Sequence, residues 1–291
     1  MLNIENILFP VDLSEPCRAA APFVRWLACR TGARVTMLHV LEMPQPYYSD
    51  LTSFLSLVDM GEMLRLRKAP FDAFLAGEFQ DLRFVRRILR FGDPVQLILE
   101  YARKLRVGMI MMPTHGMGTF RRLILGSVTA KVLHDAECPV WTDAHIESAG
   151  AEHVHPERCS KILCGLNLQE DAARVLKYAA ELAQILGAEL RLVHAVPASE
   201  SLTTKYFDAE LVTALTETAG AKIAELQSAA GTSAQVVIRG GEPAHVIRDA
   251  AIESQADLVV IGRGVLTEKL GRLRTQCYAI IRDSPCPVWS V

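Results

Sequence analysis

The chain has 291 residues, of which 50% are hydrophobic and 22% are charged, which is the composition of a globular protein with a large interior. Its formal net charge is −2, so it lacks the long-range positive field on which non-specific nucleic-acid binding depends. No apolar run reaches the roughly 18 residues of a membrane-spanning helix, and no basic-then-apolar leader precedes the first strand-like segment; we therefore expect a cytoplasmic protein with no nucleic-acid or membrane partner.

Short apolar segments alternate with helical patterns along the first half. We expect strands near residues 4–11, 34–41, 83–90, 107–113 and 138–142, and helices near 15–31, 51–77, 94–105 and 127–136. Pro70 should kink or split the second of these helices, and Asp93-Pro94 should begin the third with an acidic cap followed by proline. Residues 107–112 are apolar at nearly every position, as in a parallel strand that is covered on both faces. The alternation predicts an α/β fold with a doubly wound parallel sheet.

The second half repeats the first. Four segments match in the same order: residues 7–13 with 162–168, 38–40 with 193–195, Gly92-Asp93-Pro94 with Gly241-Glu242-Pro243, and Cys138-Pro139-Val140-Trp141 with Cys286-Pro287-Val288-Trp289. Such ordered matches indicate a tandem duplication. Residues 144–157 are polar and rich in small residues, as in a linker. We therefore predict one domain at 1–143 and a second at 158–291.

Three segments of the first half should meet at one edge of the sheet, because ligands of doubly wound sheets bind outside the carboxyl ends of the strands. Asp12 follows the first strand, Val40 ends the second, and the segment from Pro113 leaves the fourth. Glycines at 116, 118 and 126 allow backbone N–H groups to approach an anion, and a helix that begins near Ser127 offers further N–H groups. This pattern is typical of a phosphate site, but a tight turn and a helix cap would explain the same residues.

A longer set of motifs resembles the universal stress protein family. The set comprises Pro10-Val11-Asp12-Leu13-Ser14, Thr114-His115-Gly116, nine residues, Gly126-Ser127-Val128, and then Cys138-Pro139-Val140. The similarity covers both halves, as in the tandem members of that family. It implies two five-stranded parallel-sheet domains of the adenine nucleotide α-hydrolase-like fold.

The resemblance also implies a ligand, which is ATP or a related adenine nucleotide, with or without magnesium. Asp12 and the backbone of Val40 would meet the adenosine, and Gly116, Gly126, Ser127, Val128 and Thr129 would surround the phosphates. The full set of candidate binding residues is Pro10, Val11, Asp12, Val40, Met112, Pro113, His115, Gly116, Gly126, Ser127, Val128 and Thr129.

Both halves depart from the family pattern of Gly-x-x-Gly, nine residues, then Gly-Ser/Thr. In the first half Pro113 stands at the first glycine, where proline removes a backbone N–H, so ATP affinity should be reduced or lost. In the second half, alignment of Cys286-Pro287-Val288 with residues 138–140 places Ile261 at Pro113, Gly264 at Gly116, Arg274 at Gly126 and Thr275 at Ser127, while Asn167 replaces Asp12. We expect Arg274 to block ATP in the second half, although Arg263, Arg272 and Arg274 would suit a different anion.

Several other residues have simpler structural interpretations. His39 and His194 lie at equivalent strand ends and are expected to be hydrogen-bonded structural histidines. The basic runs at 65–68 and 86–87 are typical of solvated surfaces, whereas Arg121-Arg122 lies within the predicted phosphate loop. Ser127 is close to His115 in sequence, but no acid is evident to orient the imidazole. We predict no catalytic residues and no metal site.

Three functions remain open. The favoured one is a non-catalytic stress-response regulator that binds ATP or a related nucleotide through its N-terminal domain. Its last strands, at residues 139–141 and 287–289, would pair as in the family's dimers, here within one chain as a pseudo-dimer that could dimerise again. The alternatives are a scaffold in which neither half binds nucleotide, and a weak ATPase in which Asp12 is the candidate base or metal ligand.

Overall fold

The computed structural model describes residues 2, 4–42, 60–115, 125–144, 159–197, 209–264 and 272–291. The first half contains β1 (Asn6–Pro10), α1 (Glu15–Thr31), β2 (Arg34–Leu41), α3 (Met60–Ala73), β3 (Val85–Phe91), α4 (Pro94–Lys104), β4 (Met109–Met111), α5 (Ser127–Asp135) and β5 (Val140–Thr142). The second contains β6 (Lys161–Gly165), α6 (Ala172–Leu186), β7 (Glu189–Val196), α7 (Ala209–Ala230), β8 (Gln235–Gly240), α8 (Pro243–Ser254), β9 (Leu258–Ile261), α9 (Arg272–Asp283) and β10 (Val288–Ser290).

One sequence expectation about a helix needs correction. Pro70 lies inside α3, which continues to Ala73, so this proline does not split the helix. The part of that predicted helix before Met60 lies outside the described residues, as does the predicted linker after Ala144. Asp93 and Glu242 act as predicted: each side chain accepts hydrogen bonds from N–H groups in the first turn of its helix, α4 or α8, and proline follows each one.

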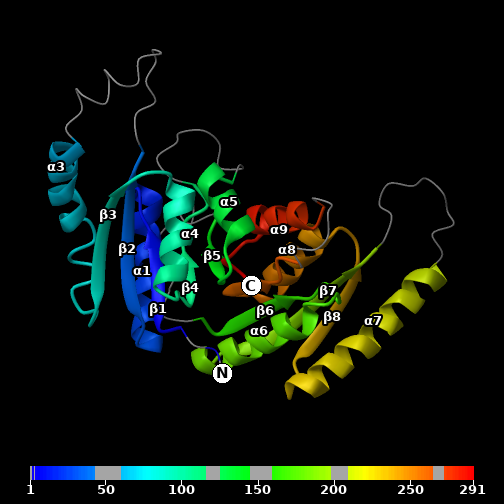
Figure 1. The fold of residues 1–291 in the computed structure, drawn as a ribbon. Coiled ribbons are helices and arrows are strands. Elements are labelled where there is room, and N and C mark those ends of the chain that lie inside the picture. Colours follow the sequence, from blue (N-terminus) through cyan, green and yellow to red (C-terminus); the bar gives the residue numbers. More distant parts are fainter. Residues whose placement is uncertain are drawn as a thin grey trace, which may run out of the picture.

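The described strands form one ten-stranded sheet in the order β3-β2-β1-β4-β5-β10-β9-β6-β7-β8 (Figure 1). Within each half the strands are parallel, and the orders β3-β2-β1-β4-β5 and β8-β7-β6-β9-β10 are equivalent. The halves join through the antiparallel pair of β5 and β10, in which Trp141 lies opposite Trp289. The predicted α/β fold with a doubly wound sheet in each half is therefore confirmed.

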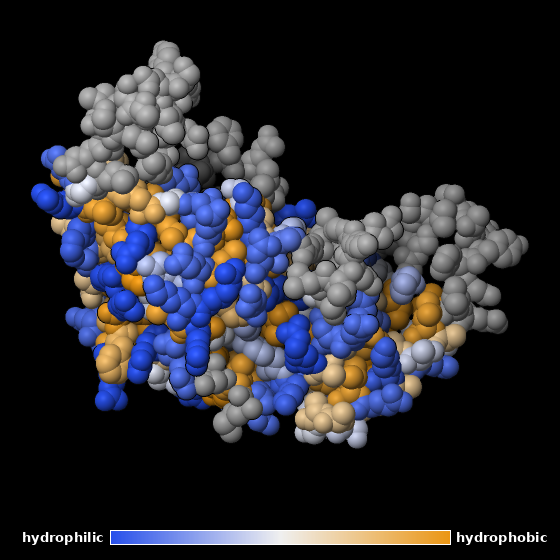
Figure 2. Space-filling model, in the orientation of Figure 1, coloured by the Kyte–Doolittle hydropathy of each residue, from blue (hydrophilic) through white to orange (hydrophobic). Residues whose placement is uncertain are grey.

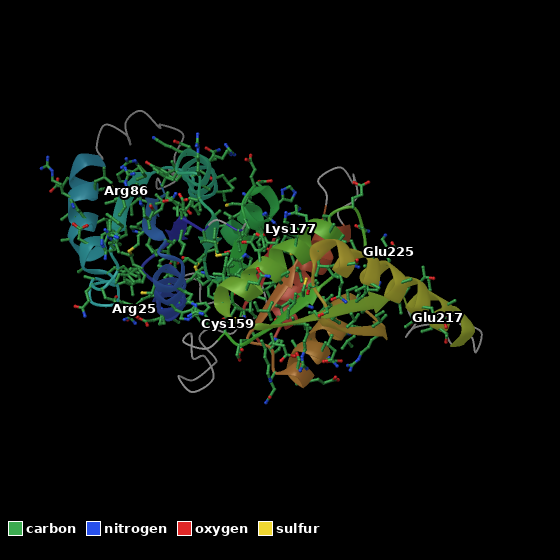
Figure 3. All side chains as sticks on the ribbon, turned by 90° about the horizontal axis from the view of Figure 1, so that it is seen from below. Arg25, Arg86, Cys159, Lys177, Glu217 and Glu225 are labelled. Carbon is green, nitrogen blue, oxygen red and sulfur yellow. The ribbon has the colours of Figure 1, made fainter. Side chains whose placement is uncertain are left out.

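Helices cover both faces of the sheet. Side chains alternate along each strand: Ile7 and Phe9 belong to the apolar layer that contains residues of α1, α3, α6 and α7, whereas Leu8 belongs to the layer that contains residues of α4, α5, α8 and α9. Each apolar layer contains residues from both halves. On the outer surface in the view of Figure 2, hydrophilic residues cover much of the first half, with apolar residues between them. Seen from below, Arg25 and Arg86 lie at one end of the molecule, and Glu217 and Glu225 lie along α7 at the other (Figure 3).

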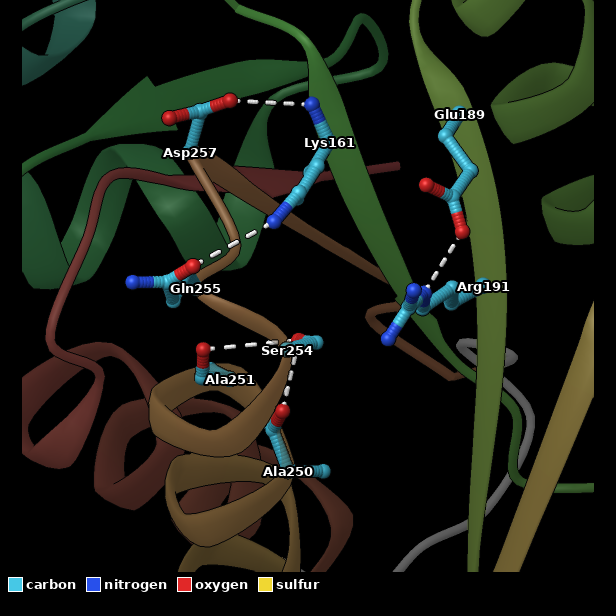
Figure 4. Close-up of polar contacts among 8 residues, drawn as sticks. All are labelled: Lys161, Glu189, Arg191, Ala250, Ala251, Ser254, Gln255 and Asp257. Carbon is cyan, nitrogen blue, oxygen red and sulfur yellow. Dashed lines mark hydrogen bonds and ion pairs between the residues drawn. The ribbon is translucent and has the colours of Figure 1, made fainter.

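Polar contacts fix the amino ends of the second-half strands. Asp257, just before β9, accepts hydrogen bonds from the backbone N–H of Lys161 (2.9 Å) and from Ser160, just before β6. At the end of α8, the Ser254 hydroxyl donates to the Ala250 carbonyl (2.6 Å; Figure 4). Because parallel strands share a direction, their carboxyl ends lie at the opposite edge of the sheet, where the candidate site is found.

Candidate functional site

A cavity of about 850 Å³ opens at the carboxyl ends of β1, β2 and β4. Pocket volumes of roughly 300–1,000 Å³ are usual for small-molecule sites. Eleven of the twelve predicted binding residues line it: Pro10, Val11, Asp12, Val40, Met112, Pro113, His115, Gly126, Ser127, Val128 and Thr129. The twelfth, Gly116, lies outside the described residues. Segments more than one hundred residues apart in sequence thus meet where the doubly wound topology predicts.

The turn after β1 holds Asp12 at the cavity wall. The Val11 N–H donates to the Leu38 carbonyl (2.9 Å), and Leu13 then adopts the left-handed backbone conformation, with φ 68°. Oδ1 of Asp12 accepts a hydrogen bond from the Ser14 N–H (3.0 Å) and another from the Cys17 thiol (3.2 Å). The carboxylate is therefore oriented by its own turn and by the first turn of α1.

His39 supports the same turn from β2. Its Nδ1 lies 2.7 Å from the Val11 carbonyl oxygen; since a carbonyl only accepts, Nδ1 carries the proton. Burial lowers the pKa of His39, and the positive charge of Arg67 adds to this lowering, while the bond to Val11 and the charge of Asp12 oppose it. In the second half His194 lies at the same distance from the Leu166 carbonyl. Both histidines make the backbone contact expected of structural histidines.

Gly126 brings the start of α5 against the end of β4. Its N–H donates to the Thr114 carbonyl (2.7 Å), and a Cβ at this position would lie 3.0 Å from that same oxygen. The Ala130 N–H donates to the Gly126 carbonyl (2.8 Å), which is the first bond of the α5 ladder. The N–H groups of the preceding first turn therefore have no acceptor within the helix, and the helix dipole adds positive potential there. This part of the cavity suits an anion.

Thr129 lines the cavity and also holds the loop after β4. Its side chain is 3% exposed, and its hydroxyl donates to the Pro113 carbonyl (3.1 Å). The hydroxyl proton is therefore used to hold the loop after β4 against α5. Ser127, in contrast, is exposed at the first position of the helix.

Sequence reasoning missed the part of the cavity that α3 and α4 provide. Met63 and Arg67 of α3, and Pro94 and Ile98 of α4, belong to the lining. Arg67 lies in a basic run that we interpreted as merely solvated, and only the packing of α3 over the sheet brings it to the cavity. Arg121 and Arg122, which the sequence places within the predicted phosphate loop, lie outside the described residues.

Strand register corrects the alignment of the two halves. Leu8 pairs with Ile110, and its counterpart Leu163 pairs with Val259, so Ile110 corresponds to Val259 and Pro113 corresponds to Gly262 rather than to Ile261. The motif alignment was wrong by one residue there because the segment between β9 and β10 is one residue shorter than that between β4 and β5: Gly262 and Cys286 are 24 positions apart, whereas Pro113 and Cys138 are 25 apart.

The second half places a carboxylate beside the counterpart of Pro113. A Cβ on Gly262 would lie 2.7 Å from Oδ2 of Asp171, whose side chain is 4% exposed. Oδ1 of Asp171 accepts a hydrogen bond from Asn167 (3.0 Å), the counterpart of Asp12, and Oδ2 lies 3.8 Å from Arg174. A buried carboxylate at this strand end opposes an anionic ligand. Arg263, one of the arginines expected to suit an anion, instead donates to carbonyls of the first half.

The described residues contain neither a cluster suited to a metal ion nor a helix suited to a membrane. Within the described ranges, no group of three or more His, Cys, Asp or Glu side chains is placed to hold a metal ion. Among the helices that the structure describes, none is both long and apolar enough to cross a membrane.

Comparisons with known proteins agree on one family. The model of the universal stress protein family matches residues 3–142 and 159–291. A universal stress protein of Thermus aquaticus is 33% identical over 139 residues, which are 47% of this chain and 96% of that protein. One from Methanocaldococcus jannaschii is 28% identical over 149 residues, 47% of this chain and 92% of that protein. The crystal structure of a universal stress protein from Archaeoglobus fulgidus covers 99% of this chain and 96% of its own, with a TM-score of 0.67 at 22% identity, a likeness of fold.

Proposed function

Because the chain belongs to the universal stress protein family, with one match in each half, we propose that it is a non-catalytic stress-response regulator whose first domain binds ATP or a related adenine nucleotide. The ligand would lie in the cavity at the carboxyl ends of β1, β2 and β4. The observation that carries the proposal is the meeting of Asp12, Val40 and the first turn of α5 around that one cavity.

The two ends of the cavity match the two ends of a nucleotide. Val11, Val40, Met112 and Ile98 supply apolar contacts suited to a flat base, and Asp12 is an acceptor for ribose hydroxyl groups. The first turn of α5 offers backbone N–H groups and a favourable dipole to phosphates, and Arg67 supplies a cation at the lining. Magnesium would accompany the phosphates, which bind this ion in many nucleotide sites.

Pro113 favours a second candidate function, a scaffold that binds no nucleotide. Proline cannot donate a backbone hydrogen bond, and the carbonyl of this residue is already bonded to Thr129. The loop after β4 therefore contributes fewer donors than a glycine at this position would allow. A third candidate, weak ATP hydrolysis, depends on Asp12, whose Oδ1 accepts from Ser14 and Cys17.

Thermal unfolding with and without Mg-ATP separates these candidates. A ligand at about 100 times its dissociation constant stabilises the folded state by about 2.7 kcal/mol, so millimolar ATP should raise the unfolding temperature. No shift at millimolar ATP would leave the scaffold as the better account. Phosphate release above background that disappears in Asp12→Ala would instead support the ATPase.

Ser127→Glu tests the position of the phosphates. A carboxylate in the first turn stabilises a helix but repels phosphate, so the variant should fold and lose the ATP-dependent shift. Ala173→Glu is the matched control, because Ala173 is exposed in the first turn of α6 in the second half. A full ATP shift in Ser127→Glu would show that the phosphates do not bind at α5.

The joined sheet supports the related proposal of an intramolecular pseudo-dimer. The β5–β10 pair buries Trp141 and Trp289, which is the contact that the family's dimers make between chains. Light scattering should then report the 32.1 kDa mass of one chain, or twice that mass if pseudo-dimers associate in pairs.

A further inference from the structure

Arg263 crosses from the second half to the first. It follows β9, in the segment that corresponds to the loop after β4, yet its hydrogen bonds are made to the end of α5. Nη1 lies 3.2 Å from the Leu133 carbonyl and 2.8 Å from the Ala136 carbonyl, and Nη2 lies 2.9 Å from the Cys138 carbonyl. One guanidinium thus binds three backbone carbonyls that lie at least 125 residues away in sequence.

Leu133 lies in the last turn of α5, Ala136 is the C-cap and Cys138 follows two residues later, so the guanidinium lies at the end of the helix where a cation is most effective. The last carbonyls of a helix have no partner within the helix, and they form the negative end of its dipole. Burial lowers the pKa of Arg263, but an arginine remains charged in proteins. Its partners here are carbonyl dipoles in a partly buried setting, so the charge is stabilised by the end of α5 and in turn stabilises it.

The other end of the same helix forms the anion end of the cavity. α5 has nine residues, about 13 Å of helix, and its first turn lines the cavity while its last turn is bound by Arg263. A second contact lies between them: the Tyr278 hydroxyl of α9 donates to the Ala130 carbonyl (2.8 Å). The second half therefore contacts α5 at its middle and at its carboxyl end.

We propose that Arg263 is a positioning residue through which the second domain sets the phosphate end of the first domain's nucleotide cavity. This inference rests on the proposed function and deepens it. The second domain places the Asp171 carboxylate beside Gly262, the counterpart of Pro113, and its loop arginine is directed to the first domain's α5. A short helix that is held at its carboxyl end presents its first-turn N–H groups in one arrangement, which lowers the cost of ordering them around a phosphate.

The test compares ATP with adenosine in the full chain. In Arg263→Gln we expect ATP to bind about fivefold more weakly, the loss that corresponds to one helix-end charge interaction of about 1 kcal/mol, while adenosine binding changes by less than about twofold. Arg263→Lys, which keeps the charge but not the three-carbonyl geometry, should fall between. Tyr278→Phe should weaken ATP binding in the same direction. Arg239→Gln is the control, because Arg239 pairs with Glu253 on the second-half surface.

Hydrogen exchange without nucleotide provides the independent readout. Amides of residues 127–135 should exchange faster in Arg263→Gln than in the wild type, including those near the cavity, whereas amides of α4 should not change. Unchanged exchange in α5 overturns the inference, as does equal weakening of ATP and adenosine, which would indicate general damage. If the wild type binds no ATP, the proposed function fails, whereas the exchange of α5 still decides whether Arg263 holds the helix.

Discussion

Replacing Gly126 by alanine tests the close contact that forms the floor of the candidate site. The added methyl would lie 3.0 Å from the Thr114 carbonyl oxygen and 3.5 Å from Cα of His115. Both are backbone atoms, so relief requires the loop after β4 to move away from α5. That movement would also lengthen the 2.7 Å bond from the Gly126 N–H to the same carbonyl.

Two opposing effects determine how far Gly126→Ala changes the free energy of unfolding. Overpacking of a tight site costs about 1–3 kcal/mol, whereas replacing glycine by alanine stabilises the folded state by about 0.4–1 kcal/mol, because the unfolded chain loses freedom. Gly77→Ala provides the second effect alone: its Cβ would meet nothing within 4 Å, and the residue does not have a positive φ. The difference in unfolding free energy between the two variants is therefore the cost of the contact, about 1–3 kcal/mol.

Urea unfolding followed by far-UV circular dichroism measures this difference. Gly126→Ala should be less stable than Gly77→Ala, and its unfolding temperature should no longer rise with Mg-ATP. Equal stability of the two variants would refute the reasoning, because it would mean that α5 and the loop after β4 are not in contact as described. A full ATP response in Gly126→Ala would show that this contact does not shape the binding site.

Three further predictions concern the core, pH and the thiols. Trp289→Ala should lower the unfolding free energy by about 3–5 kcal/mol in urea, because the side chain is 1% exposed at the joint between the halves and its Nε1 donates to Tyr178 (3.1 Å); a loss below about 1 kcal/mol would contradict that packing. Burial lowers the pKa of His39 below its ordinary value of 6.5, so the unfolded chain binds the proton first, and stability should fall as the pH decreases below about 6.5. His39→Gln should reduce this slope, and an unchanged slope would remove His39 as its source. With a thiol reagent at pH 8, exposed Cys29 should react first. Cys17 should react only on unfolding, because burial raises its pKa to about 12. Simultaneous labelling of the two thiols would contradict this order.

Local sequence signals were sufficient for the elements and for most of the site. Apolar runs marked the strands, acidic residues before Pro94 and Pro243 marked two helix starts, and the ordered repeat of motifs marked the duplication. Strand ends and glycine positions indicated where Asp12, Val40 and the segment from Pro113 should meet, because parallel strands bring their carboxyl ends to one edge. The full set of candidate binding residues came from the resemblance to the universal stress protein family.

Contacts between distant segments were decided only by the tertiary structure. Sequence patterns indicate which residues share a face three or four positions apart in a helix or two apart in a strand. They could not predict that Arg67 lines the cavity or that the Thr129 hydroxyl donates to the Pro113 carbonyl. Motif matching also missed the one-residue shift that makes Gly262 the counterpart of Pro113, since hydrogen bonds between strands set the register and the segment between β9 and β10 is one residue shorter than that between β4 and β5. Arg263 shows the same limit most clearly: the sequence marks it as a cation near a degenerate anion loop, but its partner, the end of α5, is determined by how the two halves pack across β5 and β10.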